Sequence, residues 1–237
     1  GQIPAEGEMG KRCRSLFITI PGYNLLGWDA SGLELRMLAH FMAKYDDGAY
    51  TRVVLEGDVH TVNQQAAGLK TRANAKTFIY AFLYGAGGWK IGLVPGVSDE
   101  EIAAMKLETG QWNLAKATIV KRKKAPSDLN IALELRGRKL KQQFIKGLPA
   151  LGLLKEAVEA KATNQKSIKG IDGRVLPCRS PHSALNTLLQ SAGALVVKKA
   201  TILWREKRKQ NGLADKVKQV CHVHDEGQSL CAYGYEE

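Results

Sequence analysis

The stretch TRANAKTFIYAFLYG, residues 71–85, predicts a helix that carries one polar stripe on a mostly apolar body. Arg72, Lys76, Tyr80 and Tyr84 follow one another at intervals of four residues. Residues four apart drift by only about 40° around a helix, so these four share one face. The glycines that follow are typical of a helix end. The stretch therefore presents two cations and then two phenols along a single line.

The chemistry of this stripe suits a nucleoside triphosphate that lies along the helix. Arg binds a phosphate through two parallel hydrogen bonds, and Lys binds a neighbouring phosphate as a point charge. A phenol one turn later would meet the sugar and base of the same nucleotide, and a second phenol would stack on a neighbouring base. The pattern alone slightly favours a plainer interpretation, in which the cations are surface charges and the tyrosines lie at the rim of the core.

The rest of the chain alternates between strand-like and helix-like periodicity. Strands come first, then helices punctuated by Gly and Pro, and then strands again, an order typical of an α+β fold. The predicted strands are 12–20 and 25–29; the predicted helices are 32–46, several segments between about 49 and 163, and 182–209; the predicted hairpins are 167–178 and 216–233, which turn at Asp172-Gly173 and at HDEG.

The net charge of +12 is unevenly placed. Residues 1–115 hold 11 basic and 12 acidic side chains, whereas residues 116–146 hold 10 basic and 2 acidic ones. A basic half beside a neutral one is typical of a protein with a polyanionic partner, most commonly nucleic acid. On charge alone, a well-solvated helical surface explains the same pattern equally well.

Other features exclude several classes of protein. No apolar run approaches the roughly 20 residues that a membrane-spanning helix needs, and the first residues lack the apolar region of a signal peptide. The four cysteines form no CxxC pair, so neither a zinc site nor a disulfide framework is indicated. We therefore expect a protein of a reducing compartment, without a membrane partner.

Two carboxylates stand where predicted strands end. Asp29 ends the strand before the 32–46 helix, and Asp225 lies in the turn of the last hairpin. If those strands are neighbours in one sheet, the two carboxylates converge at its edge. Paired Asp side chains on rigid strand ends suit two Mg²⁺ ions, which prefer oxygen ligands. Taken singly, each Asp is better explained as an ordinary turn residue.

Three motifs in order resemble those of a known family. WDASGLELR (28–36), TRANAKTFIYAFLYG and VHDE (223–226) are similar to motifs A, B and C of the family A DNA polymerases, and most of all to the T7-phage type of replicative polymerase. The likeness extends over nearly the whole chain through the blocks QIPAEGEMGKRCRSLF, LAHFMAKYDDGAY, GDVHTVNQ, GLPAL and DGRVLPCRSPHSALNTLLQSAGAL. The resemblance implies a DNA-directed DNA polymerase, a nucleotidyltransferase of DNA replication.

The resemblance assigns the metal-binding roles to strand-end residues. Asp29 and Asp225 would be catalytic carboxylates that bind two Mg²⁺ ions, and the backbone carbonyl of Ala30 would be a further ligand. Glu226 would be a supporting carboxylate.

It assigns nucleotide binding to the stripe and to two residues outside it. Arg72 and Lys76 would hold the triphosphate of the incoming dNTP, with Lys76 counted among the catalytic residues, and His60 would add a phosphate contact. Tyr80 would pack beside the sugar. Glu34 would lie under the sugar as a steric gate against a 2′-hydroxyl, and a hydrogen bond to Tyr80 would hold it there.

A third group would contact the primer–template DNA. Tyr84 would stack near the templating base, and His224 would lie by the primer terminus. His182, Asn186 and Gln190 lie four apart on the 182–209 helix and would face the minor groove. Their side chains can meet the acceptors that every base pair presents there, so they would check the shape of a pair without reading its sequence.

The resemblance also implies the domain organisation. Residues 1–48 and 178–237 would form parts of the palm, an antiparallel sheet with helices, and residues 49–177 the mostly helical fingers. Segment 98–146 matches the family poorly in detail. A thumb and an exonuclease domain would precede the chain and more palm would follow it, so we expect a C-terminally truncated excerpt, inactive by itself for lack of the thumb.

Two residues depart from the family pattern. Trp28 stands before Asp29 where a smaller residue is usual, and Gly227 follows HDE where an apolar strand residue is usual. Because Gly weakens the interior of a strand, the position expected for Asp225 depends on how the structure accommodates Gly227.

The expected reaction is the template-directed addition of a deoxynucleotide to a primer 3′-hydroxyl. Two alternatives stay open: a relative of the single-subunit RNA polymerases, against which Glu34 argues, and a non-catalytic nucleic-acid-binding remnant. The expected partners are primer–template DNA, dNTPs and a processivity factor bound through the missing thumb. The expected location is the cytoplasm of a phage-infected or bacterial cell, or an organellar matrix.

Overall fold

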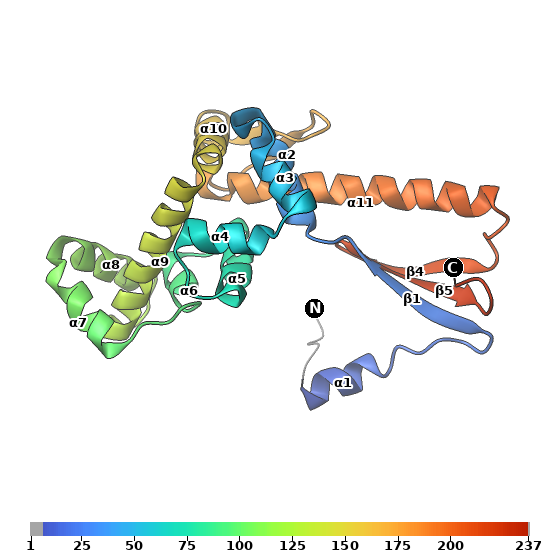
Figure 1. Cartoon of the computed structure of the whole chain (residues 1–237), viewed down its shortest axis with the longest axis horizontal. Helices are drawn as coiled ribbons and strands as arrows, with labels where there is room; N and C mark the ends of the chain where they lie inside the picture. Colours follow the sequence, from blue (N-terminus) through green and yellow to red (C-terminus); the bar gives the residue numbers. More distant parts are fainter. Residues whose placement is uncertain (1–6, 237) are drawn as a thin grey trace. The chain divides into compact units, whose positions relative to one another are not determined.

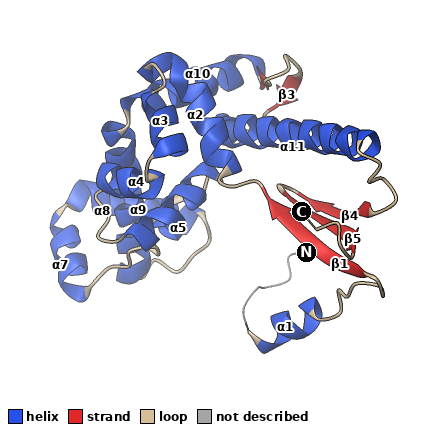
Figure 2. Cartoon of the chain, turned by 45° about the vertical axis from the view of Figure 1, so that its right-hand side comes forward, coloured by secondary structure: helices blue, strands red, loops and turns tan. Residues whose placement is uncertain are grey.

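The structure is a computed structural model of the chain, and it describes residues 7–236 (Figure 1). The chain forms two compact units. One combines Gly1–Leu33 with Gly193–Glu237, and the other is Glu34–Ala192. The α+β class is confirmed, since helices dominate and the strands form small antiparallel sheets (Figure 2). The palm and fingers boundaries at 48/49 and 177/178 stay a prediction.

The first unit is built on a three-stranded antiparallel sheet. Its order is β1 (Tyr23–Asp29), β5 (Glu226–Ala232) and β4 (Val217–Val223), so the first strand of the chain lies beside the last. The register runs from Tyr23 opposite Ala232 to Asp29 opposite Glu226. The predicted strand at 25–29 and the hairpin around HDEG are thereby confirmed.

The predicted strand at 12–20 is wrong. Glu8–Arg14 form helix α1 instead, and the residues from there to Gly22 lie in no described strand. The helix has an acidic residue in its first turn and basic residues in its last. These charges interact favourably with the helix dipole and so stabilise the helix. Glu8 also pairs with Arg12 one turn later, at 2.8 Å. The apolar residues that follow are exposed, so no sheet face buries the set that an alternating strand needs.

The second unit is helical, with one small hairpin. Predicted helices at 32–46, 71–85 and 182–209 and the hairpin at 167–178 are confirmed. Within residues 7–236, no helix has both the length and the apolar character to cross a membrane. The elements are α2 (Leu33–Asp46), α3 (Ala49–Glu56), α4 (Val59–Ala67), α5 (Arg72–Leu83), α6 (Gly88–Gly92), α7 (Asp99–Leu107), α8 (Thr109–Lys121), α9 (Asp128–Gly147), α10 (Pro149–Gln165), β2 (Ser167–Lys169), β3 (Val175–Pro177), a 3₁₀-helix (Pro181–Ser183) and α11 (Ala184–Gln210), whose second half belongs to the first unit.

The core of this unit fixes which way α5 faces. Phe78 and Phe82 on the apolar face of α5 both pack edge-on against Phe144 of α9, with ring centroids 5.1 and 5.2 Å from it. Phe78 and Phe144 are fully buried. Such aromatic pairs add a specific geometry to the apolar area that they bury. The polar stripe of α5 is therefore left on the side away from this cluster.

Segment 98–146 folds as three helices with a small core of their own. Ser98 and Glu101 form a capping box at the start of α7. Met105, Ala115 and Leu135 are buried in the cluster that α7, α8 and α9 share. This segment is therefore a folded part of the helical unit.

Candidate active site

The ends of β1 and β5 bring the first group of predicted site residues together. Asp29 is the last residue of β1 and lies opposite Glu226, the first residue of β5. The next backbone N–H, that of Ala30, donates to the carbonyl oxygen of Asp225 at 2.9 Å. The expectation that these two strands are neighbours is confirmed. Asp29, Ala30, Asp225 and Glu226 therefore lie at one end of the sheet.

A tight turn positions Asp225. β4 ends at Val223 and pairs with Glu226, so His224 and Asp225 alone form the connection between the two strands. His224 has a positive φ of 56°. The left-handed conformation suits such short hairpin turns, and His is among the residues that adopt it more readily. The backbone of the turn thus holds the Asp225 side chain at the sheet end, half-buried beside the exposed Asp29.

The residues at this sheet end are of the chemical type that suits Mg²⁺. Asp29, Asp225 and Glu226 offer carboxylates and Ala30 a backbone carbonyl, and hard divalent cations prefer such oxygen ligands; the backbone pairing places these residues at one end of the sheet without fixing the positions of their carboxylate oxygens as a ligand set. Glu226 accepts a hydrogen bond from the Gln228 amide at 3.0 Å. The metal-binding roles themselves stay predictions.

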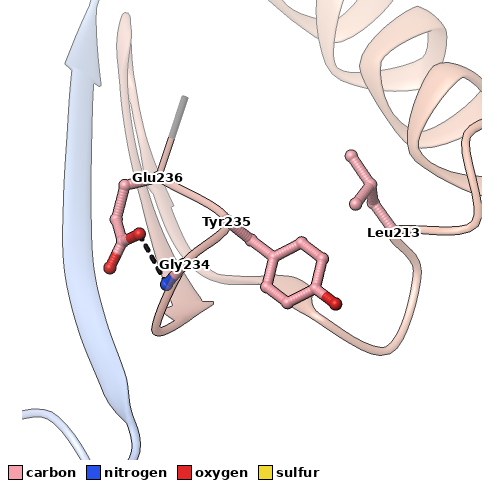
Figure 3. A pocket seen from close by; sticks show the side chains of 4 residues that line it. All are labelled: Leu213, Gly234, Tyr235 and Glu236. Atoms are coloured by element: carbon pink, nitrogen blue, oxygen red, sulfur yellow. Dashed lines mark hydrogen bonds between the residues drawn. The ribbon is translucent and has the colours of Figure 1, made fainter.

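A pocket of the first unit lies away from this end of the sheet. It is lined by Leu213, Gly234, Tyr235 and Glu236 (Figure 3). The Gly234 N–H donates to the Glu236 carboxylate at 2.8 Å, which folds the chain back just after β5. No predicted site residue lines this pocket. Gly234, Tyr235 and Glu236 come just after Ala232, the last residue of β5, whereas the predicted site lies at Glu226, the first residue of β5.

The second group of predicted residues lies in the helical unit, on α4 and α5. α5 begins at Arg72 behind its N-cap Thr71, whose side chain accepts from the Asn74 N–H. Lys76 and Tyr80 follow at one-turn intervals, and Tyr84 comes directly after the last helical residue. The helical stripe is therefore confirmed as an arrangement, whereas its role stays a prediction.

His60 lies beside this stripe. Its ring centroid is 6.5 Å from that of Tyr80. Burial lowers the pKa of His60 below its ordinary value, and the positive charges of Arg72 and Lys76 lower it further, while Asp58 acts in the opposite direction. The buried Nδ1 atom of His60 makes no hydrogen bond within the described structure. The predicted phosphate-binding residues thus share one electropositive patch.

Sequence reasoning missed the partner of Arg72. Asp58 precedes α4 as its N-cap and accepts two hydrogen bonds from the Arg72 guanidinium, at 2.8 Å from Nε and 3.0 Å from Nη2. This contact holds the pKa of the Asp58 carboxyl well below its usual range, with the Thr61 hydroxyl contributing. In the sequence, an Asp directly before a helical segment indicates an N-cap. That local pattern does not predict a contact with Arg72.

Glu34 is buried near the start of α2. Its carboxylate accepts a hydrogen bond of 2.5 Å from the Tyr84 hydroxyl and one of 3.4 Å from the Gln190 amide. Sequence reasoning missed both partners, and the expected bond from Tyr80 stays a prediction. Tyr84, predicted to stack near the templating base, is half exposed and anchored by its hydroxyl.

The remaining predicted DNA contacts lie around the start of α11. Asn186 and Gln190 are on this helix, whereas His182 lies in the short 3₁₀-helix before it and is 90% exposed. The Asn186 side-chain oxygen is buried without a hydrogen-bond partner. The His182 Nδ1 atom is 3.5 Å from the Glu159 carboxylate. The structure thus keeps these residues close along one segment, and their contacts with DNA stay predictions.

Comparison with known proteins gives consistent matches. The family model described as DNA polymerase family A matches residues 1–229. The DNA-directed DNA polymerase of Enterobacteria phage T3 is 38% identical over 257 residues, which cover 97% of this chain and 32% of that protein, and that of Escherichia phage T7 gives the same values. The chain therefore spans about a third of the length of these curated relatives.

A solved structure supports the fold. The POL domain of Pol1 from M. smegmatis, in complex with DNA primer-template and dNTP, superposes with a TM-score of 0.68. The match covers 98% of this chain and 38% of that one, at 20% sequence identity. At this identity, the likeness concerns the arrangement of the elements.

Proposed function

Because this chain belongs to DNA polymerase family A, we propose that it supplies the catalytic carboxylates and the nucleotide-binding helix of a template-directed DNA polymerase. The observation that carries the proposal is the meeting of β1 and β5, where Ala30 bonds to the backbone of Asp225 and Asp29 lies opposite Glu226. Residues 1–48 and 178–237 would serve as palm and 49–177 as fingers.

The proposed reaction joins an incoming dNTP to the primer. A bond forms between the primer 3′-oxygen and the α-phosphorus, the bond from that phosphorus to the bridging oxygen breaks, and pyrophosphate leaves. Asp29, Asp225 and the Ala30 carbonyl would hold two Mg²⁺ ions. When bound, the ions would supply positive charge to both the attacking and the leaving oxygens.

The other residues would bind and orient the nucleotide. Arg72 and Lys76 would take the phosphates, because their charges lie one helical turn apart. Lys76 would also balance the charge that develops on the leaving pyrophosphate. His60 would donate to a phosphate oxygen; burial and the charges of Arg72 and Lys76 lower its pKa, which favours the neutral ring while no phosphate is bound.

Glu34 would select deoxyribose over ribose. The carboxylate is buried and held by Tyr84 and Gln190, so it has little freedom to move aside for a 2′-hydroxyl. This rigidity favours a DNA polymerase over an RNA polymerase relative. Primer–template DNA and dNTPs would be the partners, with a processivity factor as a further one. The cytoplasm of a phage-infected or bacterial cell would be the place of action.

The test is primer extension by the complete polymerase to which the proposal assigns this chain. We expect templated extension with dATP and at least about 100-fold less with ATP, a factor that corresponds to about 2.7 kcal/mol of discrimination. Equal use of the two nucleotides would overturn the DNA assignment. The absence of templated extension with either would overturn the polymerase assignment.

A further inference from the structure

Asp58 forms more hydrogen bonds than a helix cap requires. Its Oδ1 atom accepts from the backbone N–H groups of His60 (3.1 Å) and Thr61 (3.4 Å) and from Nη2 of Arg72 (3.0 Å). Its Oδ2 atom accepts from the Thr61 hydroxyl (2.7 Å) and from Nε of Arg72 (2.8 Å). One carboxylate therefore ties the first turn of α4 to the first turn of α5.

The two functions of this carboxylate have different chemical requirements. Capping needs one side-chain oxygen, and Asn or Ser caps a helix about as well as Asp. The forked contact with Arg72 needs two negatively charged oxygens, because only a carboxylate matches the guanidinium in a bidentate, charge-assisted way. The presence of Asp at this position is thus explained by the contact with Arg72 and not by the cap alone.

We infer that Asp58 is a positioning residue that holds the Arg72 guanidinium in place for the incoming triphosphate. The inference rests on the proposed function and deepens it. The Arg72 side chain is 56% exposed and would otherwise sample many rotamers. The fork occupies two of its five N–H groups. The remaining N–H groups keep a fixed direction toward a phosphate.

The fixed guanidinium belongs to the same patch as His60. The charge of Arg72 acts on the His60 ring strongly enough to lower its pKa, and Asp58 partly offsets that effect. The carboxylate therefore limits the mutual repulsion of the cations while no phosphate is bound. Fixing a binding group in advance improves affinity, because less rotamer entropy is lost when the ligand binds.

The experiment separates the two functions of Asp58. Asp58→Asn keeps the cap and removes the forked contact. In the complete polymerase, we expect this variant to raise the KM for dNTP about tenfold and to change kcat less than about twofold, since uniform binding is lost. Asp172→Asn is the matched control, because it breaks another exposed Arg–Asp pair, that with Arg174 at 2.6 Å. The control should keep the wild-type KM.

A double-mutant cycle with Arg72→Ala tests whether Asp58 acts through Arg72. Arg72→Ala should raise the KM by itself, and adding Asp58→Asn should raise it no further. In the chain itself, the Nε–H proton of Arg72 should exchange with water faster in Asp58→Asn than in wild type, while urea unfolding shows that the variant stays folded. An Asp58→Asn effect that persists fully in the Arg72→Ala background, or an unchanged KM, would overturn the inference. An unchanged KM in Arg72→Ala alone would overturn the nucleotide-binding role in the proposed function, and this inference with it.

Discussion

The indole ring of Trp28 lies against the backbone of Gly227, its direct partner across the β1–β5 pair. A Cβ atom added at Gly227 would overlap the Nε1, Cε2 and Cζ2 atoms of that ring. The same indole lies 6.1 Å from the ring of His222, which pairs with Gly227 from β4. The two departures from the family pattern are therefore one feature, because the Trp28 ring occupies the space that a side chain at position 227 would fill. The paired strands keep their register through Gly227, so Gly does not displace Asp225.

Gly227→Val should destabilise the chain by about 1–3 kcal/mol, because the added methyl groups overfill a packed position. The second change Trp28→Ala should restore most of the lost stability, since it removes the overlapping ring. Urea denaturation of the chain and its variants measures both effects. Gly110→Ala is the control, because a Cβ there meets nothing within 4 Å. A double variant less stable than Gly227→Val alone would contradict the pairing.

Asp29→Ala or Asp225→Ala in the complete polymerase should reduce primer extension by at least about 10³-fold, because several kcal/mol of charge stabilisation would be lost with the metal. Binding of primer–template DNA should change little, since these side chains would hold metal and not the DNA backbone. Single-turnover extension and DNA-binding titrations measure the two effects separately. Asp215→Ala removes an exposed acidic residue of the same unit and serves as control. Near-normal extension by either Asp29 or Asp225 variant would refute the metal assignment.

Tyr80→Phe tests whether the stripe on α5 places a phenol beside the sugar. The resemblance implies that a phenol here accepts dideoxynucleotides and that Phe discriminates against them, because the hydroxyl takes the place of the missing 3′-hydroxyl. Loss of that hydrogen bond should cost roughly 1–3 kcal/mol, or about 5- to 150-fold in selectivity. The measurement is the ratio of kcat/KM for ddTTP to that for dTTP in the complete polymerase. If the ratio is the same in wild type and variant, Tyr80 does not face the sugar.

His60 should make the stability of the folded chain depend on pH below its ordinary pKa of about 6.5. Burial, followed by the charges of Arg72 and Lys76, lowers its pKa in the folded state. As pH falls below 6.5, the unfolded chain therefore takes up a proton that the folded chain does not, and the free energy of unfolding decreases until the folded pKa is passed. Urea unfolding at pH 7 and pH 5.5 should show a smaller decrease for His60→Gln than for wild type.

An NMR titration of the His60 ring checks the cause of this shift. Lys76→Gln removes one of the nearby charges, so the pKa of His60 should rise toward its ordinary value without reaching it, because burial and Arg72 still act. A wild-type pKa at or above 6.5 would show that the ring is not buried beside the cations.

Local patterns in the sequence predicted most of the elements, because their causes act within a few residues. Hydrophobic periodicity placed the helix at 71–85, and the Asp172-Gly173 turn placed the hairpin of β2 and β3. The segment at 12–20 shows where this fails: its first residues belong to α1, and the apolar residues after Arg14 are exposed, so no sheet face buries the set that the alternation offers.

The sequence by itself therefore determined the α+β order, the stripe from Arg72 to Tyr84 and the two strand-end carboxylates. Only the tertiary structure decided the partners of these residues: Asp58 for Arg72, Tyr84 for Glu34, and Gly227 for Trp28. It likewise decided that Glu134 of α9 is buried and accepts from Arg122, Arg138 and the Trp89 N–H. The Glu34–Tyr84 and Trp89–Glu134 pairs are 50 and 45 residues apart in the chain, and Trp28 and Gly227 lie on its first and last described strands. Their contacts depend on which elements pack against each other in the folded core. The local periodicity and the caps that define each element do not specify that packing.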